Sequence, residues 1–303
     1  MKILDRFLII IFNLSLLFVS LWVSIVGVAK SESFYYLQYK INGLTSSEVS
    51  DDYEPHSDEV VIEGRKYHVF RFLDGKRQKA LFTNEHLEQM TTHIIDFIFG
   101  NEMDFNLELD GVYVYNKNTN EYVKTDNVSV FGEVASVHMQ DVKQLFIFFQ
   151  IICVIAFVIG LGLLAYLILR IGQLKHIIFE YTMFFYAIFF TAISVFFMII
   201  LVVTFKNYME PTINEFFSTG WNLMHYIFFP FQGDKIAGSA FNDILTEILT
   251  LNFFITCVTI VVLFVLFVQA VWLAICFIAK IFGDHIGNKI KQKRYSSTIA
   301  FKK

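Results

Sequence analysis

The stretch LFIFFQIICVIAFVIGLGLLAYLIL, residues 145–169, decides the fold class of this chain. It contains no Lys, Arg, Asp or Glu, and as a helix it is long enough to cross the ~30 Å hydrocarbon layer of a membrane. A charged side chain at the centre of a bilayer costs roughly 2.5–3.5 kcal/mol on insertion scales. An uncharged apolar run of this length therefore predicts a transmembrane helix.

Three further runs share these properties, at residues 7–28, 181–204 and 253–279. Four such spans explain why 55% of the chain is hydrophobic. The first run follows Lys2 and Arg6, so a cleaved signal peptide is an alternative, but the apolar part of such peptides is only about 7–15 residues. We therefore interpret residues 7–28 as a retained anchor. The sequence predicts an α-helical integral membrane protein with four transmembrane helices.

Charges beside the spans predict the orientation of the chain. In membrane proteins, basic residues near the ends of spans concentrate on the cytoplasmic side. Residues 280–303 form a basic tail, so we expect both termini to be cytoplasmic and the segments 30–143 and 205–252 to lie outside. The basic residues that carry this inference are Lys289, Lys291, Lys293, Arg294, Lys302 and Lys303.

Segment 30–143 is large enough to form a small extracytoplasmic domain of mixed α+β type. The aromatic run FYYLQYKI at 34–41 predicts a strand, and residues 60–73 predict β-structure with a turn at Glu63-Gly64. Residues 83–100 carry apolar side chains at helical spacing between capping residues, which predicts a helix. The dipeptide Asp110-Gly111 predicts a hairpin turn.

The second outside segment, 205–252, has a different character. It is dense in aromatic residues that favour the headgroup level of a membrane, and Pro230 and Gly233 interrupt it. We expect an interfacial or re-entrant loop, with a second short helix entering the fourth span. The three cysteines, Cys153, Cys257 and Cys276, all fall within predicted spans, so no disulfide is expected outside.

The element HMQDVK, residues 138–143, places titratable groups just above the second span. His138 and Asp141 are three residues apart and share one face of a helix. His138 would lie about 10 Å above residue 145, near the headgroups, and we expect His225 at a similar depth. Two imidazoles could transfer protons near neutral pH. Asp141 or Glu133 could orient an imidazole, and Lys143 could meet a lipid phosphate or anchor its helix.

These residue types leave three interpretations open. His138 and His225 could act as acid and base in catalysis. With Asp141 they could instead bind zinc in a metal-dependent membrane hydrolase. The chain could also be a non-enzymatic envelope sensor or assembly protein, because a lone interfacial histidine is more often a structural group than a catalyst.

Over most of its length the chain resembles the bacterial lipoprotein intramolecular transacylases, the Lit family. The most specific element is HMQDVKQLF, which leads into the second span. SESFYYLQYKINGL, NEHLEQMTTHIIDFIFG, MHYIFF and the spacing from Asp243 to Phe254 add to it. The chain departs from the family pattern at Leu249 and Thr250, where the family has a proline nearby. It also lacks the tryptophan expected after HYIFF and has a longer segment at about 44–80.

The resemblance implies a multi-pass protein of the bacterial cell membrane with its active site on the outer face. Such enzymes move the sn-2 acyl chain of a diacylglyceryl-cysteine to the α-amino group of the same cysteine, which gives a lyso-form lipoprotein. The two family histidines correspond to His138 and His225. The implied partners are diacylglyceryl-modified lipoproteins and membrane lipids, and no metal, cofactor or nucleic acid is expected.

Overall fold

The computed structural model describes residues 2–100, 102–208, 212–228 and 243–300, and the chain divides into two compact units. What we call the helical unit comprises Met1–Ile25, Phe149–Val203 and Thr259–Lys303. What we call the mixed unit comprises Val26–Phe148 and Thr204–Val258 and contains the strands. Each unit is described by itself.

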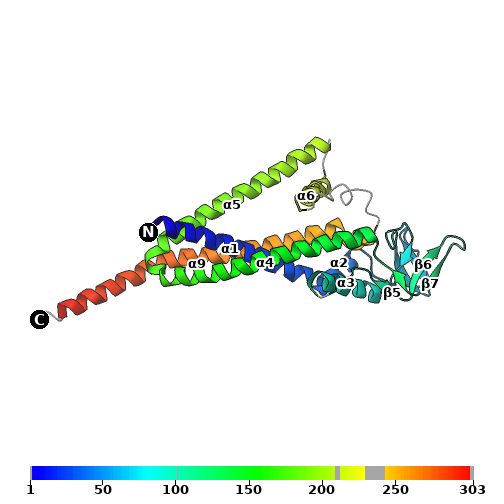
Figure 1. Cartoon of the computed structure of the whole chain (residues 1–303), viewed down its shortest axis with the longest axis horizontal. Helices are drawn as coiled ribbons and strands as arrows, with labels where there is room; N and C mark the ends of the chain where they lie inside the picture. The colour runs from blue at the N-terminus through cyan, green and yellow to red at the C-terminus, as the bar shows by residue number, and fades with distance from the viewer. Residues whose placement is uncertain (1, 101, 209–211, 229–242, 301–303) are drawn as a thin grey trace. The chain divides into compact units, whose positions relative to one another are not determined.

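Four helices of the described chain are long and apolar enough to cross a membrane (Figure 1). They are α1 (Lys2–Ala29), α4 (Glu133–Leu169), α5 (Ile171–Asn207) and α9 (Leu251–Ala300). The four predicted spans lie inside these helices, as expected for a helical membrane protein. Only Arg170 separates α4 from α5, so the connection predicted at 170–180 is mostly helical.

Buried polar side chains join three helices of the helical unit. The Asn13 amide in α1 donates to the Thr182 hydroxyl in α5 at 3.2 Å, and its carbonyl accepts from the Trp272 indole N–H in α9 at 3.1 Å. The Tyr186 hydroxyl donates to the Gln269 side chain at 2.8 Å, which links α5 directly to α9. Such hydrogen bonds hold helices together where lipid provides no hydrophobic driving force.

One ion pair fixes the start of α1. The Asp5 carboxylate, almost fully buried, accepts from Arg170 at 2.9 Å and from the Tyr166 hydroxyl at 2.6 Å. Arg170 also donates to Tyr166. Through Asp5 and Asn13, α1 packs as part of the helical unit. The interpretation of residues 7–28 as a retained span stays a prediction.

The prediction of a strand at 34–41 is wrong, because this segment belongs to the helix α2 (Glu32–Ile41). The Ser31 hydroxyl caps it by accepting from the Phe34 N–H. Tyr35 and Tyr39 are four residues apart and both are buried, and the Tyr39 hydroxyl lies 2.8 Å from that of Thr91. The helical spacing of buried tyrosines therefore outweighs the β-propensity of the individual residues.

The β-structure of the mixed unit is antiparallel throughout. Its larger sheet has the order β1-β3-β4-β6-β7, and β2 also pairs with β3. The strands are β1 (Ser47–Glu48), β2 (Glu59–Ile62), β3 (Arg65–Phe70), β4 (Ala80–Leu81), β6 (Val112–Asn116) and β7 (Glu121–Thr125). The predicted turn between β2 and β3 is confirmed: Glu63 and Gly64 both have positive φ, at 50° and 72°, as a tight hairpin turn requires.

The hairpin predicted at Asp110-Gly111 is wrong, although a turn is present there. The strand before the turn, β5 (Glu108–Leu109), pairs with β8 (Val128–Ser129), while β6 after the turn pairs with β7. The Asp110 carboxylate accepts from the Asn127 N–H at 2.8 Å. The turn therefore connects two sheets instead of closing one hairpin.

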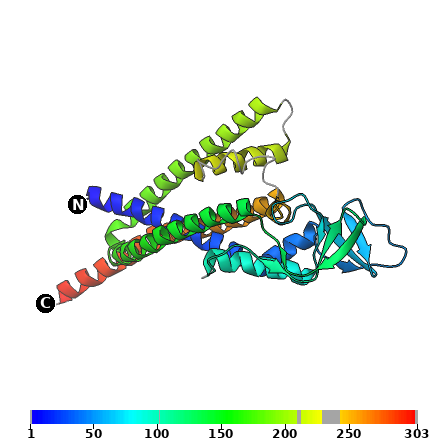
Figure 2. The same ribbon diagram turned by 45° about the vertical axis from the view of Figure 1, so that its right-hand side comes forward.

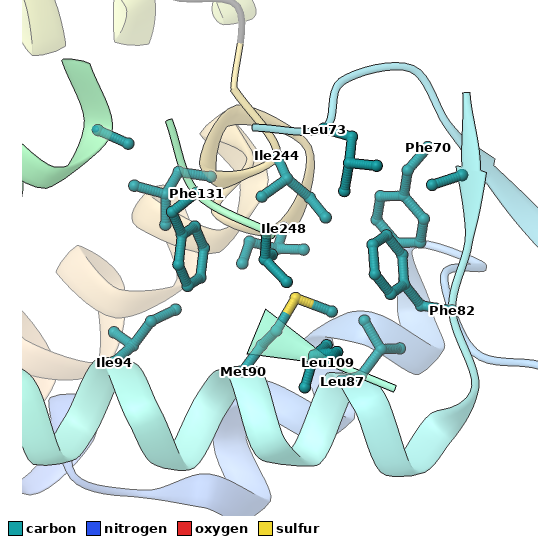
Figure 3. Packing of buried hydrophobic residues seen from close by; sticks show 14 of the residues in the cluster. Phe70, Leu73, Phe82, Leu87, Met90, Ile94, Leu109, Phe131, Ile244 and Ile248 are labelled. Carbon is teal, nitrogen blue, oxygen red and sulfur yellow. The ribbon is translucent and has the colours of Figure 1, made fainter. Parts of the chain in front are cut away.

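The core of the mixed unit forms around α3 (Asn84–Phe99), the helix predicted within 83–100. Thr83 and His86 form a capping box at its start, and Leu87, Met90, Ile94 and Phe97 on one face are buried as predicted. Figure 3 shows residues from several elements meeting above this face, and Ile244 and Ile248 are among them.

The described residues of the second predicted outside segment include two short helices. α6 (Ile213–Phe228) begins with a capping box in which Thr212 and Glu215 exchange hydrogen bonds. Its 16 residues rise about 24 Å, less than a bilayer core. α8 (Leu245–Ile248) precedes α9 and is shorter than the second helix that the sequence predicts. Residues 229–242 lie outside the described chain.

Candidate active site

His138 and Asp141 lie in the first turns of α4, within the mixed unit. The inward face of this helix is set by Ala135 and Met139, both of which are buried in the core. His138 is half-buried, and its Nδ1 atom is screened from solvent. Asp141 is also half-buried, one turn further along the helix. The predicted helical register of this pair is present, with the imidazole next to the core boundary.

Glu133 lies at the first position of α4, where its side chain is exposed. Five residues correspond to about 140° of rotation around a helix, so Glu133 and His138 do not share a face. A carboxylate in this first turn is favoured by the positive end of the helix dipole. An orienting role for Glu133 stays a prediction.

Lys143 joins α4 to the end of α3. Its ammonium donates to the backbone carbonyl of Glu102 at 2.6 Å and lies 4.6 Å from the centre of the Phe97 ring. These contacts correspond to the anchoring role that the sequence allowed for this lysine. They also leave the ammonium half-buried at the surface of the mixed unit, where a lipid phosphate remains a predicted partner.

His225 lies in the last turn of α6, and its side chain is outside the described part of the structure. That the His138 and His225 imidazoles lie close together therefore stays a prediction. Among the described residues, no group of three or more His, Cys, Asp and Glu side chains could hold a metal ion. The zinc interpretation depends on His225 and stays untested.

The structure adds a residue that sequence reasoning did not assign to the site. The Asp243 carboxylate is buried just before α8, and one of its oxygens accepts from the Gly132 N–H at 2.8 Å. The other oxygen accepts from the Leu245 N–H at 3.1 Å. Gly132 immediately precedes α4, so this carboxylate connects the second outside segment to the helix that carries His138.

Burial governs the protonation of Asp243. Desolvation raises the pKa of this carboxyl to about 6, although the hydrogen bonds from Gly132 and Leu245 favour the charged form and act in the opposite direction. The negative charge of nearby Asp74 raises the pKa further. The carboxyl consequently titrates close to neutral pH.

Glu247 provides a second anchor, on α8 itself. Its carboxylate is buried and accepts from the Arg71 backbone N–H at 3.0 and 3.1 Å, with the Arg71 Nε at 3.4 Å. Burial raises the pKa of Glu247, while the contacts with Arg71 lower it. This bond holds α8 at the end of β3.

Comparisons with known proteins give no match: no protein-family model, no curated protein and no solved structure is similar to the chain. The resemblance to the Lit family consequently depends on the motifs quoted above.

Proposed function

We propose that the protein is an intramolecular acyltransferase that acts on bacterial lipoproteins at the outer face of the cell membrane. It moves the sn-2 acyl chain of the diacylglyceryl-cysteine to the α-amino group of that cysteine. The observation that supports the proposal best is the bond between Asp243 and Gly132. Through it, the end of the segment that contains His225 meets the start of the helix that contains His138.

The proposed chemistry needs only proton transfer and positioning. The amine nitrogen attacks the ester carbonyl, a C–N bond forms, and the C–O bond to the glyceryl oxygen breaks. Because an amide is more stable than an ester, the reaction proceeds without an external acyl donor. Nucleophile and ester belong to one molecule, so correct placement supplies much of the rate.

Two histidines match the two proton transfers of this reaction. The α-amine has a reference pKa of about 7.7–8.0 and must lose a proton before it attacks. The departing glyceryl oxygen must gain one. We assign these transfers to His138 and His225. Each transfer by a positioned side chain accelerates the reaction roughly 10²–10⁴-fold, and Asp141 orients His138. Four apolar helices fit an enzyme whose substrate is held in the membrane by its acyl chains.

Co-expression with a diacylglyceryl-modified lipoprotein tests the proposal. Transfer within one molecule does not change the mass, so fragmentation spectra of the N-terminal lipopeptide must locate the acyl chain. We expect N-acyl lyso product with the wild-type protein and with the control His56→Ala, whose imidazole is exposed. We expect none with His138→Ala or His225→Ala, and product from both variants would refute the assignment.

A chelator separates this reaction from metal-dependent hydrolysis. Activity of the purified enzyme should survive the chelator. A hydrolase would instead release free fatty acid and would lose activity when the metal is removed.

A further inference from the structure

We propose that Asp243 is a positioning residue that fixes the first turn of α4 and thereby the location of the His138 imidazole. The effect on activity depends on the proposed function, whereas the effect on the location of His138 does not.

The contact holds the backbone directly before the first residue of α4. Gly132 donates its N–H to the Asp243 carboxylate at 2.8 Å, and its carbonyl accepts from the Ser136 N–H at 3.0 Å in the first helical turn. The negative carboxylate thus lies at the positive end of the helix dipole. One backbone residue connects the buried carboxylate directly to the hydrogen bonds of the helix.

The space that a side chain at position 132 would occupy is filled by backbone. A Cβ at this position would lie 2.6 Å from the Cα and N atoms of Gly75, which is closer than real Cβ atoms approach. The Asp74 N–H next to it donates to the Val130 carbonyl at 3.0 Å. Since Gly132 is confined between Gly75 and Asp243, the start of α4 has little freedom to shift.

The carboxylate itself sits on a fixed support. Ile244 and Ile248, on either side of the turn of α8, are fully buried in the core of the mixed unit (Figure 3). The second oxygen of Asp243 is occupied by the Leu245 N–H. The contact with Gly132 is therefore made by a group that cannot follow α4 if the helix moves.

The imidazole depends on this arrangement through the geometry of the helix. His138 follows Gly132 by six residues, or about 9 Å along the axis, so a change of tilt at the first turn displaces the ring. A displacement of about 1 Å at a reacting group can cost on the order of 100-fold in rate. Loss of the Asp243 contact should thus affect catalysis even though Asp243 need not touch the substrate.

Glu247 gives a matched control. It is a buried carboxylate on α8, four residues after Asp243, and it also accepts from a backbone N–H, but that N–H belongs to Arg71 at the end of β3. Glu247→Gln removes a similar charge from the same part of the core. A purely structural role would make Asp243→Asn and Glu247→Gln indistinguishable.

The test compares Asp243→Asn, Glu247→Gln and wild type as full-length proteins, well below their melting temperatures. The first measurement is the rate of acyl transfer in the lipopeptide assay. The second is the rate at which diethyl pyrocarbonate modifies His138, quantified by peptide mass spectrometry. If Asp243→Asn is not obtained as folded protein, Asp243→Ser replaces it, because the shorter side chain withdraws its oxygen from Gly132.

We expect Asp243→Asn to slow transfer about 10–100-fold and to change the modification rate of His138 several-fold, with both rates near wild type in Glu247→Gln. Wild-type values in Asp243→Asn, or equal changes in the two variants, would overturn the proposal. If wild type itself forms no N-acyl product, the proposed function fails. The modification rates of His138 then decide the positioning role alone.

Discussion

Asp243 makes the stability of the mixed unit depend on pH in a way that one substitution can isolate. Asn cannot ionise and is nearly the same size as Asp, but it places an NH2 donor where one of the two carboxylate oxygens accepts a backbone N–H. We therefore expect the difference in melting temperature between Asp243→Asn and wild type to change with pH. Other titrating groups occur in both proteins and cancel in this difference.

The magnitude follows from the pKa. Burial raises it from 3.8 to about 6, and a shift of this size is worth about 3 kcal/mol at 1.36 kcal/mol per unit. Since the folded pKa is raised, the contribution to stability is complete below pH 3.8 and is lost as pH rises through 6. Between pH 5 and pH 7.5 wild type should lose about 1.4 kcal/mol relative to the variant. For a unit of this size that is about 3–6 °C.

Thermal scans of the purified full-length protein in detergent measure this difference. A thiol-reactive dye reports unfolding, because Cys153 and Cys276 are buried and Cys257 is half-buried. The control is Asp51→Asn, which changes an exposed carboxylate and should show the same difference from wild type at both pH values. The reasoning is refuted if the difference in melting temperature between Asp243→Asn and wild type is the same at both pH values, or if it changes in the opposite direction.

Three other substitutions test the packing and capping of the fold in thermal scans of the same kind. Gly132→Ala should destabilise by several kcal/mol because its Cβ would collide with backbone, whereas Gly162→Ala, with open space around it, should be neutral; equal effects would contradict this. Ile248→Ala should cost about 2–5 kcal/mol because the side chain is fully buried, while Ile41→Ala, at a side chain that is 67% exposed, should cost well under 1 kcal/mol. The Nδ1 atom of His86 accepts a hydrogen bond in the α3 capping box, and burial lowers the pKa of this imidazole. The neutral imidazole therefore stabilises the fold above pH 6.5, and this stabilisation is lost as pH falls below that value. His86→Gln should remove this acid-side loss of melting temperature, and an unchanged acid limb would contradict the assignment.

Elements with a repeated buried face could be predicted from the sequence. In α3 the side chains of Leu87, Met90, Ile94 and Phe97 recur at helical spacing, and all four are buried in the structure. The four long helices follow from the absence of charge over a membrane-spanning length. In both cases the information lies within one continuous segment.

Prediction failed where the deciding partner is distant in sequence. The aromatic run around Tyr35 and Tyr39 has the composition of a strand, but it is helical because both tyrosines pack against the mixed unit's core. Gly111 was correctly placed in a turn, with φ of 73°, yet the strands on either side pair elsewhere. Composition alone does not specify these partners.

In the candidate site, too, features set by local sequence could be predicted and contacts between distant segments could not. The helical register of His138 and Asp141 follows from their spacing and is present in α4. The contact between Asp243 and Gly132 spans 111 residues, and an aspartate before a short helix reads as an ordinary solvent-exposed cap. Only the fold brings this carboxylate beneath the helix that carries the histidine.

The buried Asn13 has a consequence for how the chain is made. Its indole partner, Trp272, is synthesised 259 residues later, so at ~5–20 residues per second the amide waits roughly 13–50 s for it. During that interval the Asn13 amide oxygen lacks its partner, although the amide NH2 group already donates to the Ile9 carbonyl of the same helix at 2.8 Å. An unpaired polar oxygen in so apolar a helix favours retention beside the insertion machinery or another polar helix. Release of this span into lipid should therefore coincide with the arrival of the last span, and ribosome-bound chains truncated before Trp272 should still crosslink to the translocon through α1.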